Sequence, residues 1–217
     1  MSLVAKRHAT YADIEALPDN VIGEIVDGDL HVSPRPSGPH SKVSSVLGMD
    51  IGSAFHRGRG GPGGWLIIDE PELHLGHDVM VPDLAGWRRE RLAEVPTDHR
   101  FTVAPDWLCE VLSPSDKGYR RIKKLRSYKL HGVAYVWLVD PLQRTLEVLR
   151  LEHERWIVAQ LFGADEGDDR VRAEPFEAIE LELSALWWSP ETFGHGQPIV
   201  HHEPADFARA LEDDDEG

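Results

Sequence analysis

A short apolar run at residues 107–112 carries a glutamate, Glu110, in its second half. A run of this length is typical of a buried strand, and a glutamate is rarely buried unless a partner offsets its charge. The carboxylate needs a cation, a metal ion or a raised pKa, because removing an unpaired charge from water is costly. The run therefore predicts an interior strand, and it requires another part of the chain to bring a partner to Glu110.

The segment that follows is strongly basic, although the whole chain of 217 residues has a formal net charge of −15. Its cationic residues are Lys117, Arg120, Arg121, Lys123, Lys124, Arg126 and Lys129. At helical spacing, an apolar stripe (Tyr119, Ile122, Leu125, Tyr128) adjoins a basic face (Lys117, Arg121, Lys124). Most charge runs are solvated helix faces, but the neighbouring Glu110 favours a basic face that lines a site and binds nucleic acid.

A second acid, Asp83, follows Pro82 in another segment with strand character. Mg²⁺ usually takes one or two carboxylates from a protein and keeps several waters, and Asp83 with Glu110 fits that need. Lys124 is the candidate cation that orients the attacking water or neutralises charge growing on phosphorus. Pro-Asp is also a common turn pair, so Asp83 alone is weak evidence for a metal site. Together the three residues predict phosphodiester hydrolysis with Mg²⁺, or with Mn²⁺ as the alternative metal.

The rest of the chain alternates helix and strand patterns. Helices are expected at residues 10–17, 43–55 and after residue 117, and strands at 21–26, 29–33, 65–69, 79–87, 106–112, 133–139, 145–151, 156–162 and 179–183. Asp27-Gly28 predicts a hairpin turn, and Glu24 lies on its first strand, where a solvent-facing role is the simplest interpretation. His40 directly precedes the second helix and is a candidate cap. His74 and His77 are assigned to a hairpin connection, without a third ligand for zinc.

Several motifs carry a resemblance to a known family across roughly residues 10–185. They are Tyr11, the segment 23–30, Ser33-Pro34, His40, Pro82-Asp83-Leu84, the segment 110–115, Arg121 to Lys124, Tyr128, Gly132-Val133 and the segment 135–141. This set is similar to the Uma-type restriction endonuclease family, a group of the PD-(D/E)XK nuclease superfamily. The resemblance implies an α+β (mixed α/β) fold: a restriction-endonuclease-like core with a central mixed β-sheet flanked by helices and an N-terminal β-hairpin.

The same resemblance implies roles for individual residues. Asp83 and Glu110 would be the metal ligands, Lys124 the catalytic lysine, and Glu24, His40 and Arg121 accessory residues near the site. Two positions depart from the pattern. The superfamily's usual lysine, two residues beyond the second acid, is Leu112 here, and Lys124 matches the position from which this family supplies it. Arg120 stands where relatives often place an aspartate.

Composition bounds the partners and the domain organisation. We expect one nuclease-like domain at residues 1–188 and an acidic, loosely ordered extension at 189–217. The single cysteine, Cys109, excludes an intramolecular disulfide and favours a cytoplasmic setting. The longest apolar run is far shorter than the roughly 20 residues that span a membrane. Because DNA affinity comes largely from Lys and Arg, the net charge predicts only weak or narrowly targeted DNA binding. A homodimer would suit cleavage of two strands.

Three functions of different classes remain open from the sequence. The first is a metal-dependent endonuclease acting on DNA. The second is a nuclease-like domain that has lost turnover and binds nucleic acid or protein, which the acidic balance and Leu112 favour. The third is an interaction protein whose basic helix docks onto an acidic surface, such as its own C-terminal tail.

Overall fold

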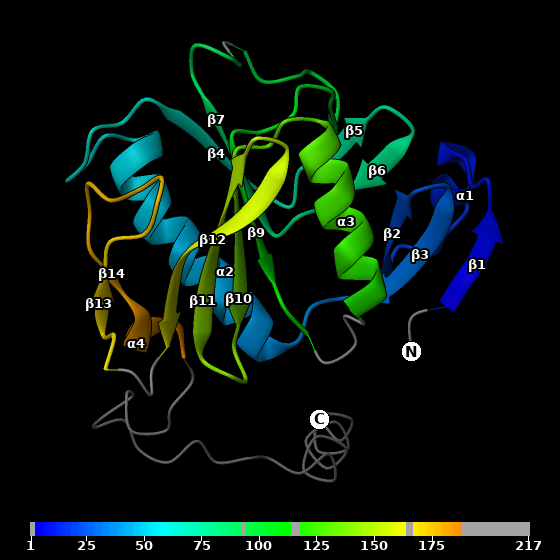
Figure 1. The fold of residues 1–217 in the computed structure, drawn as a ribbon. Helices are drawn as coiled ribbons and strands as arrows, with labels where there is room; N and C mark the ends of the chain where they lie inside the picture. Colours follow the sequence, from blue (N-terminus) through cyan, green and yellow to red (C-terminus); the bar gives the residue numbers. More distant parts are fainter. Residues whose placement is uncertain (1–2, 93, 114–117, 164–166, 188–217) are drawn as a thin grey trace, which may run out of the picture.

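The computed structural model describes residues 3–92, 94–113, 118–163 and 167–187, and these form two six-stranded sheets with few helices (Figure 1). The elements are β1 (Leu3–Arg7), α1 (Tyr11–Glu15), β2 (Val21–Val26), β3 (Asp29–Pro34), α2 (Gly38–Ile51), a π-helical turn η1 (Gly52–His56), β4 (Trp65–Asp69), β5 (Glu72–Leu75), β6 (Asp78–Met80), β7 (Leu84–Arg88), β8 (Arg100–Phe101), β9 (Trp107–Val111), α3 (Gly118–Leu130), β10 (Tyr135–Asp140), β11 (Thr145–Glu152), β12 (Arg155–Gly163), β13 (Arg170–Val171), β14 (Leu181–Glu182) and α4 (Leu183–Leu186). The predicted α+β class and mixed sheet are confirmed.

The main sheet has the strand order β12-β11-β10-β9-β7-β4. Its centre is a parallel pair, β9 and β10, connected by α3, and the other neighbouring strands are antiparallel. Parallel neighbours need a crossover connection, and α3 provides it. The predicted interior strand is therefore β9, with strands on both sides.

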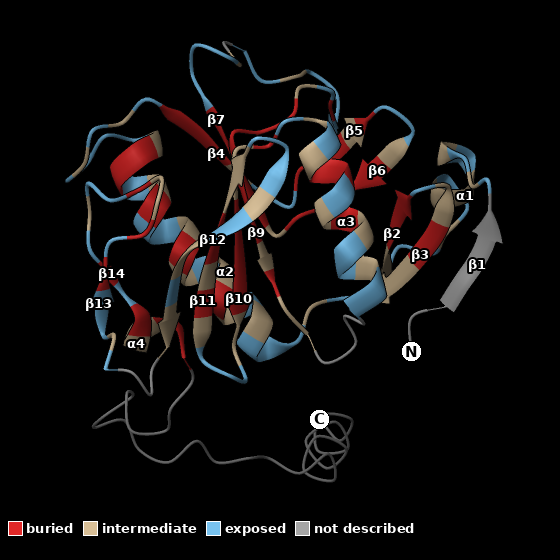
Figure 2. Ribbon diagram, in the orientation of Figure 1, coloured by how far each residue is buried: buried red, intermediate tan, exposed pale blue. Residues whose placement is uncertain are grey.

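The two faces of the main sheet are covered by different helices. Trp107, Cys109 and Val111 of β9 pack in the core cluster that contains the apolar side of α2. Leu108 packs instead in the cluster that contains Tyr128 of α3. Successive strand residues point to opposite faces, so Glu110 points to the α3 side. Figure 2 shows the central strands of this sheet as buried.

The predicted N-terminal hairpin is β2 and β3, and it belongs to a larger unit than expected. It is continued by β1 on one side and by β6, β5 and β8 on the other, which gives the hairpin sheet β1-β3-β2-β6-β5-β8. The single strand expected at residues 79–87 is in fact two strands, β6 and β7, one in each sheet. Pro82 lies at the break. Because proline has no N–H for a ladder bond, regular strand pairing stops there, and Asp83 lies between the two strands.

Two expectations about helices are corrected. The second helix begins at Gly38 with Ser37 as its N-cap, so His40 lies in its first turn and does not precede it. In α3, Tyr119 and Ile122 are about two-thirds exposed, whereas the buried residues are Lys124, Ser127 and Tyr128. The helix buries polar groups because it faces carboxylates of both sheets. Leu125 and Tyr128 of the predicted apolar stripe do pack on the core, so the stripe identified the inner face only in part.

Within the described ranges, no helix is long and apolar enough to cross a membrane. Trp187 and Leu186 are buried, as is Cys109. The proposed extension at 189–217 lies outside the described residues, so the domain boundary near residue 188 stays a prediction.

Candidate active site

Asp83 lies directly before β7 and is fixed from two sides. Its Oδ2 accepts a hydrogen bond from the backbone N–H of Val111 at 2.7 Å, and its Oδ1 lies 2.5 Å from Nε2 of His40. The bond to Val111 fits the antiparallel register of β7 and β9, in which Leu84 faces Cys109. Asp83 is thereby held beside Glu110, its counterpart on the neighbouring strand.

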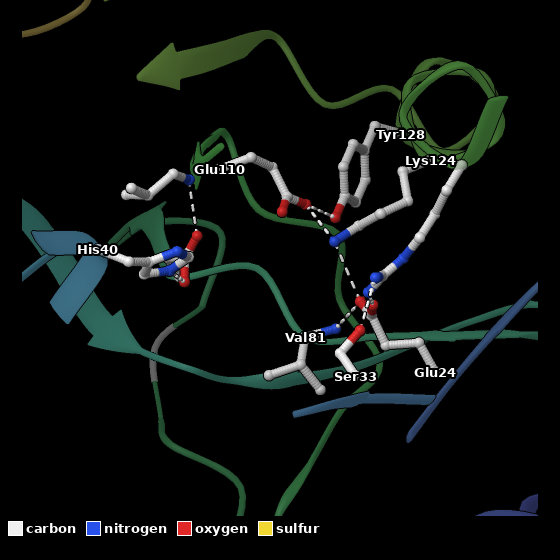
Figure 3. Close-up of polar contacts among 10 residues, drawn as sticks. Glu24, Ser33, His40, Val81, Glu110, Lys124 and Tyr128 are labelled. Carbon is white, nitrogen blue, oxygen red and sulfur yellow. Dashed lines mark hydrogen bonds and ion pairs between the residues drawn. The ribbon is translucent and has the colours of Figure 1, made fainter. Parts of the chain in front are cut away.

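Glu110 receives two bonds from α3, the helix that covers its face of the sheet. Its Oε1 lies 2.5 Å from Nζ of Lys124 and 2.6 Å from the hydroxyl of Tyr128, which donates to it. Figure 3 shows both side chains reaching from the helix to this carboxylate. The partner that the sequence required for a buried Glu110 is therefore provided mainly by Lys124.

Lys124 links the two sheets. Its ammonium also lies 3.0 Å from Oε1 of Glu24, which is 1% exposed on β2 of the hairpin sheet. Glu24 accepts further bonds from the backbone N–H of Val81, at 2.9 Å, and from the guanidinium of Arg120. Arg120 in turn donates to Ser33 at 2.6 Å. Glu24 is thus an internal anchor for the two cations of α3, and the expectation of a solvent-facing strand residue is wrong.

Burial and neighbouring charge perturb the ionisable groups. The pKa of Glu110 is raised, first by burial and then by the negative charge of Asp83, while Lys124 opposes the shift. The pKa of Tyr128 is raised well above its usual value by burial and by Glu110, so the phenol stays neutral and can donate. Burial lowers the pKa of Arg120. Burial and the charge of Asp83 therefore destabilise the ionised form of Glu110, and a bound cation would stabilise it.

These side chains line one cavity of about 230 Å³ between the two sheets. Six of the proposed site residues share it: Glu24, His40, Asp83, Glu110, Arg121 and Lys124. Arg121 is exposed at its rim. Lys117, the remaining proposed nucleic-acid contact, lies outside the described residues.

Arg120 and Tyr128 are the contacts that the sequence interpretation did not assign to the site. Both are four residues from Lys124, so all three lie on one helix face. That spacing was a usable signal. The same sequence is ambiguous, however, because Tyr128 also fits an apolar stripe and Arg120 departs from the family pattern.

The donor set can be tested for metal binding. Among the described residues, no group of three or more His, Cys, Asp or Glu side chains is arranged to hold a metal ion. Asp83 and Glu110 nevertheless give two carboxylates on one cavity, and two is the number that Mg²⁺ commonly takes when waters and substrate phosphate complete its shell. The residues fit a magnesium ion that is shared with substrate, and they do not fit a closed structural metal site.

Comparison with known proteins adds a family. A family model described as "Putative restriction endonuclease" (Uma2) matches residues 9–185. Among solved structures, the chain is similar to the crystal structure of a protein from Anabaena variabilis described as "a putative nuclease belonging to DUF820". The two share 26% sequence identity with a TM-score of 0.66, over 82% of this chain and 97% of the other. No curated protein matches the sequence.

Proposed function

Because this chain belongs to the Uma2 family, whose model is described as "Putative restriction endonuclease", we propose that it is a metal-dependent endonuclease that hydrolyses DNA phosphodiester bonds. The observation that carries the proposal is the meeting of Asp83, Glu110 and Lys124 on one cavity. The charge pattern fits a substrate phosphate, because two acids and an ammonium can hold a metal and a developing negative charge at one point.

Each residue has a defined role in this proposal. Asp83 and Glu110 hold Mg²⁺, with Mn²⁺ as the alternative metal. When bound there, the ion polarises the phosphoryl oxygen and lowers the pKa of water. Lys124 supplies a positive charge beside Glu110, where it neutralises charge that grows in the transition state or orients the attacking water. His40 holds Asp83, and Glu24 holds Lys124.

The ion pair between Lys124 and Glu24 fixes the position of the Lys124 ammonium. An ammonium on a flexible four-carbon side chain is a poor catalyst unless its position is fixed. Here the side chain is 7% exposed and its Nζ lies between two carboxylates. The lysine is thus preorganised before substrate arrives, which is what electrostatic catalysis requires.

The test is a nuclease assay with Mg²⁺ or Mn²⁺ on single-stranded DNA, duplex DNA and RNA. We expect wild-type cleavage that requires metal, and Asp83→Asn, Glu110→Gln and Lys124→Met proteins that lose at least about a hundredfold in rate. Far-UV circular dichroism and melting temperature check that each variant is folded. Cleavage at the wild-type rate by both acid variants would eliminate this mechanism.

A second function is favoured by specific observations. The cations Arg120, Lys123 and Lys124 pair with acids inside the fold, and the net charge is −15. A nuclease-like domain without turnover, which binds nucleic acid or a protein, is consistent with both. Wild-type protein that binds DNA and yet cuts none of the substrates with either metal would favour this function over the first.

A further inference from the structure

A second cavity, of about 720 Å³, continues from the candidate active site. It runs beside α2 and η1, and it shares Pro36, His40 and Asp83 with the smaller cavity. We call it the α2 groove. From this structure and on the basis of the proposed nuclease function, we propose that the α2 groove binds one strand of nucleic acid that continues from the scissile phosphate.

Continuity is the first argument. A polymer whose phosphate reaches Asp83 has to leave the small cavity in some direction, and the shared residues make the α2 groove a direct route. From His40 to Arg57 the helical segment rises about 25 Å, at about 1.5 Å per residue. One strand of B-form DNA advances about 3.4 Å per nucleotide along the helix axis, and an uncoiled strand covers more, so the groove has room for at most about seven nucleotides.

Charge at the far end is the second argument. Arg57 and Arg59 line the groove there, and both are exposed. Within the described part of the chain, neither forms an ion pair. Their positions are built by the fold: the N–H of Arg59 donates to the carbonyl of Ser53 at 2.8 Å, and that of Gly63 donates to Ala54 at 3.0 Å. The loop is folded back onto η1, which places two available guanidinium groups at the rim.

The helical wall is the third argument. Away from its buried apolar side, the helical wall of the groove contains the larger residues His40, Met49 and His56, but most of its residues are small: Ser41, Ser44, Ser45, Gly48, Gly52 and Ser53. A Cβ added at Gly52 would meet nothing within 4 Å, and its φ of −62° is ordinary for a helix. Neither packing nor backbone geometry therefore requires this glycine, which has low helix propensity. Open space and serine hydroxyls suit a close phosphate backbone.

The opposite wall orients the strand. It carries Asp69 and Glu70, at and just after the end of β4. These carboxylates repel phosphates, so the backbone of a bound strand faces α2 and the two arginines, and its bases face β4.

The test measures binding in EDTA, where cleavage is absent, with labelled single-stranded oligonucleotides of 4 and 12 nucleotides. Arg57→Gln/Arg59→Gln is compared with a matched control, Arg144→Gln/Arg155→Gln, which removes two exposed arginines elsewhere. We expect the groove variant to bind the 12-mer about tenfold more weakly, with a slope of log K against log salt that is smaller by about 1.4. The control variant and all 4-mer affinities should stay near wild type.

Gly52→Leu tests space without changing charge. Because an added Cβ meets nothing within 4 Å and leucine has a higher helix propensity than glycine, the melting temperature should be unchanged or higher, while 12-mer binding falls. Wild-type affinity for the 12-mer in both groove variants, or equal loss of 4-mer and 12-mer binding, would overturn the proposal. If the two groove variants show such binding and also cut DNA normally, the groove proposal is overturned while the nuclease proposal stands. If the wild-type protein cuts nothing, the nuclease proposal fails while the binding comparison still decides the groove.

Discussion

Replacing Arg120 with methionine is expected to destabilise the protein strongly, because it leaves Glu24 buried with less positive charge. Glu24 is 1% exposed and accepts bonds from Arg120, Lys124 and Val81. Removing one partner of a buried ion pair typically costs about 3–5 kcal/mol. Since Lys124 and the Val81 N–H remain, we expect a smaller cost than this, about 2–3 kcal/mol. Methionine keeps most of the aliphatic packing, so the loss is mainly electrostatic.

This cost should appear as a fall in melting temperature of about 5–10 °C, since 1 kcal/mol corresponds to roughly 2–4 °C in a protein of this size. The assay is thermal and urea unfolding followed by circular dichroism. Arg126→Met on the same helix is the matched control, because Arg126 is exposed. It should change the stability by less than about 0.5 kcal/mol.

A double-mutant cycle separates charge from packing. If the penalty arises from an uncompensated Glu24 carboxylate, then Arg120→Met combined with Glu24→Gln should be more stable than Arg120→Met alone. A melting temperature within about 2 °C of wild type for Arg120→Met would refute the reasoning, as would simple addition of the two single effects. The first result would mean that Lys124 suffices for Glu24, and the second that the guanidinium acts through packing.

Two further predictions concern Glu110 and the main sheet. Burial raises the pKa of Glu110 above its ordinary value of 4.5. The contribution of Glu110 to stability is therefore full below that value and is lost as the pH rises through the folded-state pKa. Glu110→Gln, which does not titrate, should gain melting temperature relative to wild type as the pH is raised above 4.5, and a pH-independent difference would contradict this. Gly86→Ala should lower the free energy of unfolding in urea by about 1–3 kcal/mol. The reason is that the new Cβ would lie 2.9 Å from Cδ1 of Ile67 and 3.1 Å from Cε3 of Trp107. Wild-type stability would show that this part of the sheet adjusts easily to the added methyl group.

Local sequence patterns were sufficient to predict much of the fold. The Asp27-Gly28 turn, with φ of 53° and 76°, forms between β2 and β3 as expected, since those residues favour the left-handed region that the turn needs. The apolar run with one acid became β9. Such features depend on neighbouring residues only, so the sequence expresses them directly.

Long-range pairing was not predictable in the same way. The break between β6 and β7 sends one half of an apparently continuous strand pattern to each sheet, and only the partners of those strands determine this. The inner face of α3 shows the same limit. Hydrophobic periodicity assumes an apolar interior, whereas this helix meets Glu24 and Glu110, and its lysine is buried in place of Ile122. Where two sheets present acids to one helix, complementary charge decides the orientation.

Leu112 stands where the superfamily pattern has its usual lysine, and its surroundings show what takes the place of that lysine. Leu112 packs in the same core cluster as Leu108, on the α3 side of the sheet, and it lines the small cavity. A lysine at this position would extend into the same space that Glu110 faces. Lys124 reaches that carboxylate from the opposite direction, from the helix that covers the strand. The cavity therefore has one ammonium beside its second acid despite the substitution. Leu112 therefore does not by itself imply loss of turnover, and the formal net charge of −15 is the feature that speaks more strongly against binding of a nucleic acid.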